Sequence, residues 1–264
     1  MQFILHEPPP HLADSVKAIW CARGTREEFA TPEPIVPDGC VEIIFNLADP
    51  FRNGEVQPLA LLAGEMTGPV VPVPTGAVDL IGVRFRPGRA GAALRTPIWE
   101  LQDQLIDASS VMHRADRLID DLRDLRNGAR LDHLCSELAH RVRARQSRSP
   151  EAVDHAIEMI QAQGGNIGID RLARTIGITR RHLERRFRDE VGLSAKQLAR
   201  IARVQSVLRL IHAQPLLSGA EIAAHCGYSD QPHMIRECKA SAGQTPPRLT
   251  TAARSLAGLM RGAA

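Results

Sequence analysis

Residues 169–191, IDRLARTIGITRRHLERRFRDEV, decide how the carboxy-terminal half of the chain folds. Gly177 is expected to end a short helix, and the hydroxyl of Thr179 can cap the helix that follows. On that second helix Leu183, Phe187 and Val191 recur every fourth residue and predict a buried stripe. A short helix, a glycine turn and a second helix rich in arginine are typical of a helix-turn-helix, whose second helix enters the DNA major groove.

A second copy of this pattern lies about fifty residues further along the chain. Residues 221–228 repeat residues 171–178, and Arg236 then corresponds to Arg185. The repeat keeps buried positions, turn glycines and exposed cations in register, which rarely happens by chance. The sequence therefore predicts two DNA-reading units in one chain.

Several short motifs accompany the repeat. They are Leu172-Ala173, the turn at 177–179, the helix start at 180–187, the signature at 227–231, and Gly243, Thr245 and Pro246. Through these motifs the segment from about 151 to 251 resembles the DNA-binding domain of the AraC/XylS family of bacterial transcription regulators. The resemblance implies a sequence-specific regulator, with double-stranded DNA and RNA polymerase as partners. Cys238 departs from the aromatic residue that is usual in this family, which predicts looser packing in the second unit.

Length and composition bound the other possibilities. The 264 residues allow two domains with separate cores. No apolar run approaches the roughly 20 residues of a membrane span, and the start lacks the pattern of a signal peptide. The five cysteines are scattered, without paired spacing. We therefore expect a reduced, cytoplasmic protein with no membrane segment.

Charge divides the chain into two unlike halves. Residues 150–264 contain 16 Lys and Arg against 10 Asp and Glu, whereas residues 1–149 contain 17 against 20. A cationic half beside an acidic half suits a nucleic-acid binder with an attached module that does not touch DNA.

The predicted fold class is α+β, with residues 1–110 forming a small antiparallel β barrel or sandwich. Residues 41–47 and 78–85 are rich in β-branched side chains, and shorter strands are expected around 59–63 and 70–73. The stretches 37–40 and 82–88 also resemble the cupin-like amino-terminal domains of one subgroup of these regulators. None of the histidines in this half lies in a predicted strand, so we expect no metal, no cofactor and no enzyme activity.

Arg84 and Arg86 are the residues we single out as possible effector ligands. They alternate with apolar residues and should share one face of a strand, where two guanidinium groups could bind an anionic small molecule. The same pattern also fits a solvated sheet face, or pairing with Glu65 or Asp79.

A second hypothesis for the amino-terminal half is an alkylation or redox sensor that uses Cys21 or Cys40. A reactive thiol needs an exposed, cationic setting. Cys40 is instead flanked by Val41 and Glu42, which favours a small buried side chain.

Residues 111–146 predict a helical hairpin, and with it the domain limits. Two apolar stripes at helical spacing either dimerise the protein, as the resemblance implies, or pack back on the β domain. The predicted domains are 1–149 for sensing or oligomerisation and 150–252 for DNA binding, with a frayed tail at 253–264 and an arginine-rich linker at 141–150.

The reading units are joined by a predicted long helix around residues 198–211. At about 1.5 Å per residue, some twenty helical residues span about 30 Å, close to the roughly 34 Å between successive major grooves. A monomer can then cover two adjacent grooves.

The side chains on the two second helices divide into two predicted roles. Base contacts need paired donors or acceptors, and at the positions where the resemblance puts such contacts stand Arg181, Arg185, Gln231 and Arg236. Two further predicted base contacts are Glu184, which could accept from a cytosine amino group, and His233, which could reach a base or a phosphate. Glu184 has the alternative of pairing with Arg180 or Arg188 on its own helix. The predicted phosphate anchors, which orient without specifying, are Arg180, Arg188, Lys196, Arg200 and Lys239.

Overall fold

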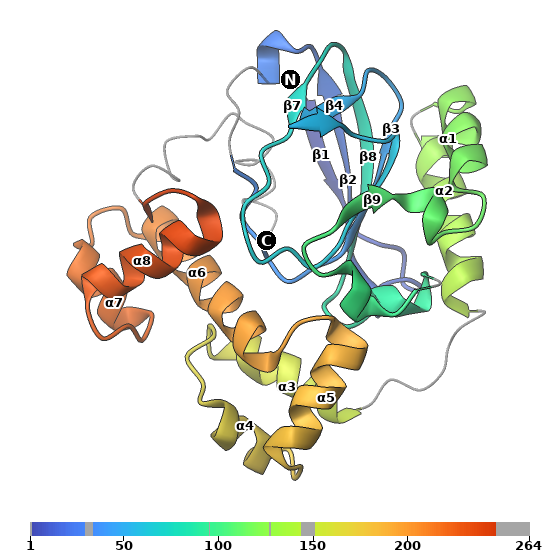
Figure 1. The fold of residues 1–264 in the computed structure, drawn as a ribbon. Coiled ribbons are helices and arrows are strands. Elements are labelled where there is room, and N and C mark those ends of the chain that lie inside the picture. Colours follow the sequence, from blue (N-terminus) through green and yellow to red (C-terminus); the bar gives the residue numbers. More distant parts are fainter. Residues whose placement is uncertain (1, 30–33, 95, 127, 144–150, 247–264) are drawn as a thin grey trace.

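The protein folds into an amino-terminal domain rich in β-strands and a carboxy-terminal helical domain (Figure 1). The computed structural model describes residues 2–29, 34–94, 96–126, 128–143 and 151–246. The predicted α+β class is confirmed. Residues 144–150 of the predicted linker, most of the helix predicted after Thr245 and the predicted tail at 253–264 lie outside the described residues.

Two antiparallel sheets build the first domain. The larger has the order β1-β2-β8-β3-β6-β9, and the smaller the order β5-β4-β7. Their bounds are β1 (Gln2–His6), β2 (Val16–Gly24), β3 (Glu42–Asn46), β4 (Phe51–Asn53), β5 (Glu55–Val56), β6 (Ala60–Ala63), β7 (Val73–Pro74), β8 (Val78–Phe85) and β9 (Leu105–Asp107). The strands predicted at 41–47, 59–63 and 78–85 are present. The strand predicted at 70–73 is wrong, since Val70 makes only an isolated bridge to Ile35 before the short β7.

The large sheet presents two different faces because side chains alternate along each strand. Val83 and Phe85 of β8 lie in the main hydrophobic core. Leu80 faces the other way, into a cluster with Trp20. Gly82 makes room for the Trp20 ring, since a Cβ there would lie 2.1 Å from the indole. The second face of the sheet is therefore hollow enough to hold a large aromatic ring.

A helical hairpin, α1 (Ala115–Asp124) and α2 (Gly128–Arg143), covers the first face of the large sheet (Figure 1). Leu118 and Leu122 of α1 and Leu134 and Leu138 of α2 belong to the same core as the strands. Of the two alternatives for the apolar stripes, the structure shows packing against the chain's own sheet. Short 3-10 helices lie in the connections between elements: η1 (Glu27–Phe29), η2 (Ala90–Ala92) and η3 (Ile98–Leu101) between strands, and η4 (Ala108–Ser110) between β9 and α1.

Six described helices form the second domain. They are α3 (Glu151–Ala162), α4 (Ile169–Thr175), α5 (Arg180–Val191), α6 (Ala195–Ala213), α7 (Gly219–His225) and α8 (Gln231–Ala242). One hydrophobic cluster joins α3, α4, α5 and the start of α6, and a second joins the rest of α6 to α7 and α8. Each cluster contains one of the two predicted units.

The two units are built with the same local devices. Gly177 and Gly227 adopt φ of +74° and +72° in the two turns, where a side chain would be strained. Thr179 accepts a hydrogen bond from the His182 backbone N–H at 3.2 Å and so caps α5, and Asp230 caps α8 in the same way. The predicted repeat is thus present in the fold. None of the described helices is long and apolar enough to span a membrane.

Candidate nucleic-acid interface

The first reading helix, α5, separates its buried and exposed residues as predicted. Leu183, Phe187 and Val191 are completely buried. Arg181 and Arg185 are exposed, and among the described residues neither has a hydrogen bond or an ion pair. Two unpaired guanidinium groups one helical turn apart are free to donate to a groove edge.

The other charged residues of α5 are partly engaged. The Nε of Arg180 donates to Glu184 Oε1 at 2.8 Å, and its Nη1 lies 3.3 Å from Asp170. Glu184 thus adopts the alternative of pairing along its own helix. Arg186 pairs with Glu190, also within α5. These pairs leave Arg181 and Arg185 as the cations of the helix best placed for bases.

The second reading helix, α8, carries exposed Gln231, Arg236 and Lys239. His233 is half-buried: its ring lies edge-on to Tyr228, with centroids 5.3 Å apart, and its Nδ1 is 3.1 Å from the Ser229 hydroxyl. These contacts orient the His233 ring before any DNA arrives. Its predicted base contact stays a prediction, as do the roles of the exposed residues.

Glu237 connects α8 to the helix α6, a contact that no local sequence pattern predicts. Its carboxylate accepts two hydrogen bonds from Arg203, at 2.9 and 3.0 Å, and one from the buried Tyr228 hydroxyl at 3.0 Å. The Arg203 guanidinium also stacks over the Tyr228 ring, 4.7 Å from its centroid. Arg200, a predicted phosphate anchor, lies 3.6 Å from the same carboxylate. These contacts of Glu237 hold α8 against α6.

A cationic groove separates the two units. It is lined by Arg180, Lys196, Arg200 and Arg203, together with His233 and Glu237. Lys196 is exposed. Three predicted phosphate anchors, Arg180, Lys196 and Arg200, therefore meet in one groove, and their contact with DNA phosphate stays a prediction.

Arg188, another predicted phosphate anchor, contacts the amino-terminal domain instead. Its guanidinium lies over the ring of Trp99 in η3, 5.6 Å from the centroid. By helical spacing Arg188 shares a face with Arg181 and Arg185. The first domain therefore reaches the edge of the surface that we expect to face DNA.

One loop of the first domain touches the ends of both reading helices. Gly192 and Gly243 end α5 and α8 with φ of +82° and +70°. A Cβ on Gly192 would lie 2.8 Å from the Glu65 carboxylate, and a Cβ on Gly243 would lie 3.1 Å from Pro69. Glu65 is 1% exposed, and its Oε2 has no hydrogen-bond partner among the described residues. Burial raises the pKa of Glu65 to about 8.

The structure separates the two arginines predicted to bind an effector. Strand β8 ends at Phe85, so Arg86 leaves the sheet and donates to the Ala13 carbonyl at 2.7 Å. Arg84 is buried, and it pairs with Glu42 and Asp38 rather than with Glu65 or Asp79. The expectation that both arginines share one strand face is therefore wrong. Of the two arginines, only Arg84 remains a candidate for contacting an effector.

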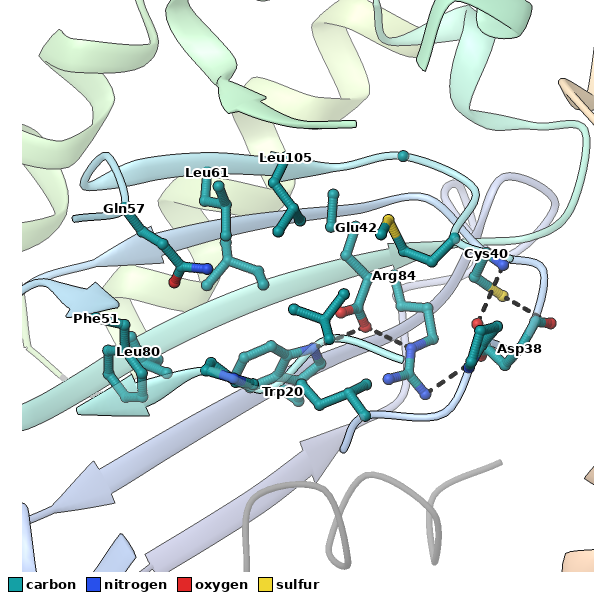
Figure 2. A pocket seen from close by; sticks show the side chains of 18 of the residues that line it. Trp20, Asp38, Cys40, Glu42, Phe51, Gln57, Leu61, Leu80, Arg84 and Leu105 are labelled. Atoms are coloured by element: carbon teal, nitrogen blue, oxygen red, sulfur yellow. Dashed lines mark hydrogen bonds and ion pairs between the residues drawn. The ribbon is translucent and has the colours of Figure 1, made fainter. Parts of the chain in front are cut away.

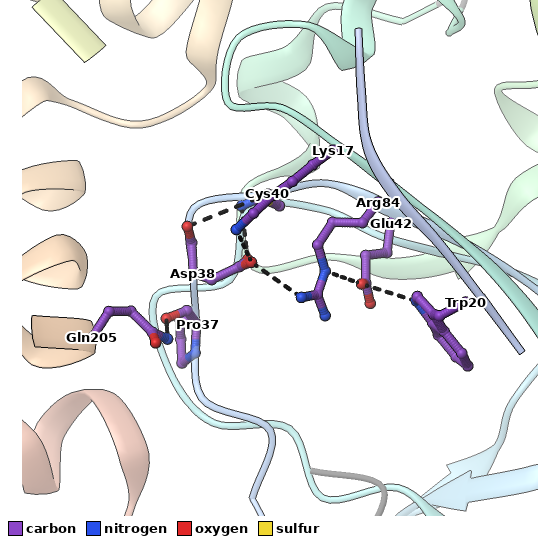
Figure 3. A network of polar contacts seen from close by, with 8 residues as sticks. All are labelled: Lys17, Trp20, Pro37, Asp38, Cys40, Glu42, Arg84 and Gln205. Atoms are coloured by element: carbon purple, nitrogen blue, oxygen red, sulfur yellow. Dashed lines mark hydrogen bonds and ion pairs between the residues drawn. The ribbon is translucent and has the colours of Figure 1, made fainter. Parts of the chain in front are cut away.

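Arg84 lies at the centre of a buried polar network (Figure 3). Its Nε donates to Glu42 at 2.5 Å and its Nη1 lies 3.5 Å from Asp38. Trp20 also donates to Glu42, and Lys17 lies 3.5 Å from Asp38. Burial by itself would raise the pKa of Asp38, but Arg84 and Lys17 together hold it below its usual value. The network therefore consists of two carboxylates and two cations.

A cavity of about 100 Å³ opens beside this network, on the second face of the large sheet (Figure 2). A single water needs about 10–15 Å³ on the same measure, so the cavity is of small-molecule size. Its lining comes from Trp20, from β3, β6 and β8, and from residues 35–38 and Cys40. Gln205 of α6 also lines it.

The cysteines give the sensor hypothesis no support. Burial raises the pKa of Cys40 well above its ordinary value, and the carboxylate of Asp38 adds to the effect. Burial also raises the pKa of Cys21. Neither thiol has the low pKa that makes a cysteine reactive. In the described part of the chain no group of three histidines, cysteines or carboxylates is placed to hold a metal ion.

Comparison with known protein families gives two separate matches along the chain. Residues 172–252 match a helix-turn-helix domain family, and residues 5–107 match a domain family of unknown function, DUF6597. No curated protein matches the chain.

The solved structures similar to this chain include three bacterial regulators. A regulator with an AraC-type DNA-binding domain from Chromobacterium violaceum is 22% identical, with 42% of this chain and 91% of that chain covered and a TM-score of 0.35. The C-terminal domain of AraT from Geobacillus stearothermophilus is 24% identical, with coverage of 39% and 85% and a TM-score of 0.36. ToxT from Vibrio cholerae is 7% identical, with coverage of 94% and 97% and a TM-score of 0.49.

The family match covers both units of the sequence repeat. Within it, two helix-turn-helix units with glycine turns and capped reading helices are joined by the single helix α6. The resemblance drawn from the sequence is thereby confirmed for the carboxy-terminal part of the chain, where residues 172–252 match a helix-turn-helix domain of the AraC type.

Proposed function

We propose that this regulator reads two adjacent major grooves of one DNA duplex, with α5 in the first and α8 in the second. The observation that carries the proposal is the connecting helix α6, which has 19 residues and packs against both units. At about 1.5 Å per residue it spans about 28 Å, close to the roughly 34 Å that separate successive major grooves.

The choice of DNA sequence is assigned to exposed side chains that make no ion pair or hydrogen bond within the described part of the protein. Arg181 and Arg185 on α5, and Gln231 and Arg236 on α8, are exposed and belong to the residue types that read guanine and adenine edges. Lys196 and Lys239 act as phosphate anchors. Arg200 can anchor as well, but it also pairs with Glu237.

Control is assigned to the amino-terminal domain, acting through a small effector. Support comes from its contacts with the DNA-binding domain, at α5, at α6 and at the end of α8. Control by dimerisation through the hairpin is the weaker alternative, because the apolar stripes of α1 and α2 are buried in the chain's own core. RNA polymerase is the expected partner on the promoter.

The test compares one reader with one anchor. Selection of bound sequences from a random DNA pool gives the preferred site, and affinities are then measured for Arg185→Ala and Lys196→Ala over a range of salt concentrations. We expect Arg185→Ala to cost about 1–3 kcal/mol on the preferred site and to relax the choice at one or two base positions.

Lys196→Ala is the matched control, since it also removes one exposed cation. It should weaken binding to all sequences equally and reduce the salt slope by about one. If the two variants lost affinity uniformly across sequences, the division into readers and anchors would be refuted. Selected sites that contain a single recognition block would refute the reading of two grooves.

A further inference from the structure

We infer that the cavity beside Arg84 binds a small, uncharged, largely apolar molecule that presents one hydrogen-bond acceptor to the Arg84 guanidinium. This inference rests on the proposed control by an effector, and it names the site and the chemical class. The sequence suggested that Arg84 binds an anionic effector. The structure instead favours an uncharged ligand at this arginine.

The walls of the cavity favour an apolar body. Most of its lining side chains are hydrophobic, among them Trp20, Ile44, Phe51, Leu61 and Leu105 (Figure 2). Concave sites lined mainly by apolar groups, with a few fixed polar groups, are typical of small-molecule binding.

The polar end of the cavity is already balanced in charge. The Arg84 side chain is 7% exposed and contacts two carboxylates, Glu42 and Asp38, which are 11% and 17% exposed. Lys17 supplies the second cation. A ligand carboxylate on Arg84 would bring a third negative charge beside Glu42 and Asp38, where little water can screen the repulsion, and this repulsion weakens its binding.

Arg84 still has a donor to offer. Its two ion pairs use Nε and Nη1, and Figure 2 shows the other terminal nitrogen, Nη2, turned toward the space beside Trp20. A ketone, amide, lactone or alcohol oxygen can accept from Nη2 without adding charge. A neutral acceptor is therefore the group that this end of the cavity selects.

One part of the cavity wall, residues 35–38, also contacts the DNA-binding domain. Residues 35–38 line the cavity, and the Pro37 carbonyl accepts a hydrogen bond from Gln205 of α6 at 2.7 Å (Figure 3). Gly39 approaches α6 so closely that a Cβ would lie 2.5 Å from Leu198. Val36 packs in the same core cluster as α6, α7 and α8. An occupant of the cavity therefore touches a loop that holds the connecting helix.

The experiment uses three probes with the same ring and different charge: cyclohexanone, cyclohexanecarboxylate and cyclohexylammonium. Their binding to the full chain is measured by calorimetry at neutral pH. We expect cyclohexanone to bind, and both the carboxylate and the ammonium to bind about tenfold more weakly or not at all. On binding, the ketone's carbonyl stretch should move to lower frequency, as it does when a guanidinium donates to it.

Two independent measurements place the probe in this cavity. Leu61→Trp fills the space and should abolish binding of cyclohexanone, whereas Val56→Trp adds the same ring at a position 54% exposed and should leave binding unchanged. Nuclear Overhauser contacts between the ketone and the Trp20 ring locate the ligand without any substitution, so the test does not depend on the folding of a variant.

Coupling to DNA is measured with the same probe. Saturating cyclohexanone should change the affinity for the selected DNA site by some factor, and saturating DNA must change the affinity for cyclohexanone by the same factor. The effect should become smaller in Leu198→Ala, which removes the α6 side chain beside Gly39, while binding of the ketone remains because Leu198 does not line the cavity.

Three results would overturn the inference: equal or tighter binding of the carboxylate, ketone binding that survives Leu61→Trp, or no binding of any probe. Failure of the proposed function would look different, because it would appear as loss of sequence preference in DNA binding without any ligand present.

Discussion

Glu65→Gln should make the protein more resistant to alkaline conditions. Glu65 is 1% exposed, its Oε2 is unpartnered among the described residues, and burial raises its pKa from 4.5 to about 8. The folded protein therefore keeps a proton that the unfolded chain releases. Stability is fully present below about pH 4.5 and is lost as the pH rises through about 8. A shift of this size corresponds to about 5 kcal/mol, at about 1.36 kcal/mol per pH unit.

Glutamine keeps the shape of the protonated carboxyl and cannot ionise. At pH 5 the variant and the wild type should differ little in their free energy of unfolding. Above pH 8 the variant should be the more stable, by up to about 5 kcal/mol. Urea unfolding followed by tryptophan fluorescence at several pH values measures the difference directly.

The matched control is Glu100→Gln, which removes an exposed carboxylate from the nearby η3. A wild type and a Glu65→Gln variant whose stabilities run parallel from pH 5 to pH 9 would refute the assignment of a neutral, buried carboxyl at the end of α5.

Three other substitutions test the contacts between and within the domains. Trp99→Ala should raise DNA affinity about two- to fivefold in an anisotropy titration at fixed salt, because it frees Arg188 for phosphate; an unchanged affinity would show that the two do not compete. Gly192→Ala should lower the thermal midpoint more than Gly177→Ala, because both positions have positive φ but only the first meets atoms of the other domain; equal losses would mean that backbone strain alone is at work. Glu237→Gln should cost about 3–5 kcal/mol of unfolding free energy in urea by leaving a half-buried guanidinium underpaired, and a cost below about 1 kcal/mol would contradict this.

The parts of the fold that the sequence predicted well depend on neighbours within a few residues. A buried stripe at every fourth position, a glycine turn and a capping side chain placed α5, and the repeat of these signals placed α8. Strands β3 and β8 were recognisable because their β-branched residues follow turn signals. In such segments local preference and tertiary packing agree.

The parts that were missed depend on residues far apart in the sequence. Strand β2 pairs with both β1 and β8 in the large sheet, but its mixed composition gives no local signal. Glu237 precedes the buried Cys238, and nothing along the helix shows that Arg203, 34 residues earlier, approaches it. The partners of Arg84 were mistaken because Glu42 lies opposite it on the next strand, a pairing that only the register of β3 and β8 reveals.

The loop that carries Glu65 and Pro69 limits how freely the two halves of this protein can be recombined. A chimera that keeps the DNA-binding half but takes its sensory half from a relative would bring foreign side chains to Gly192 and Gly243, where an added methyl group would overlap Ile98 and Glu65 at the first position and lie in tight contact with Pro69 at the second. A chimera should therefore keep residues 64–70 of this chain together with α5 and α8. Biosensor designs that exchange the sensory half should place their junctions outside this loop.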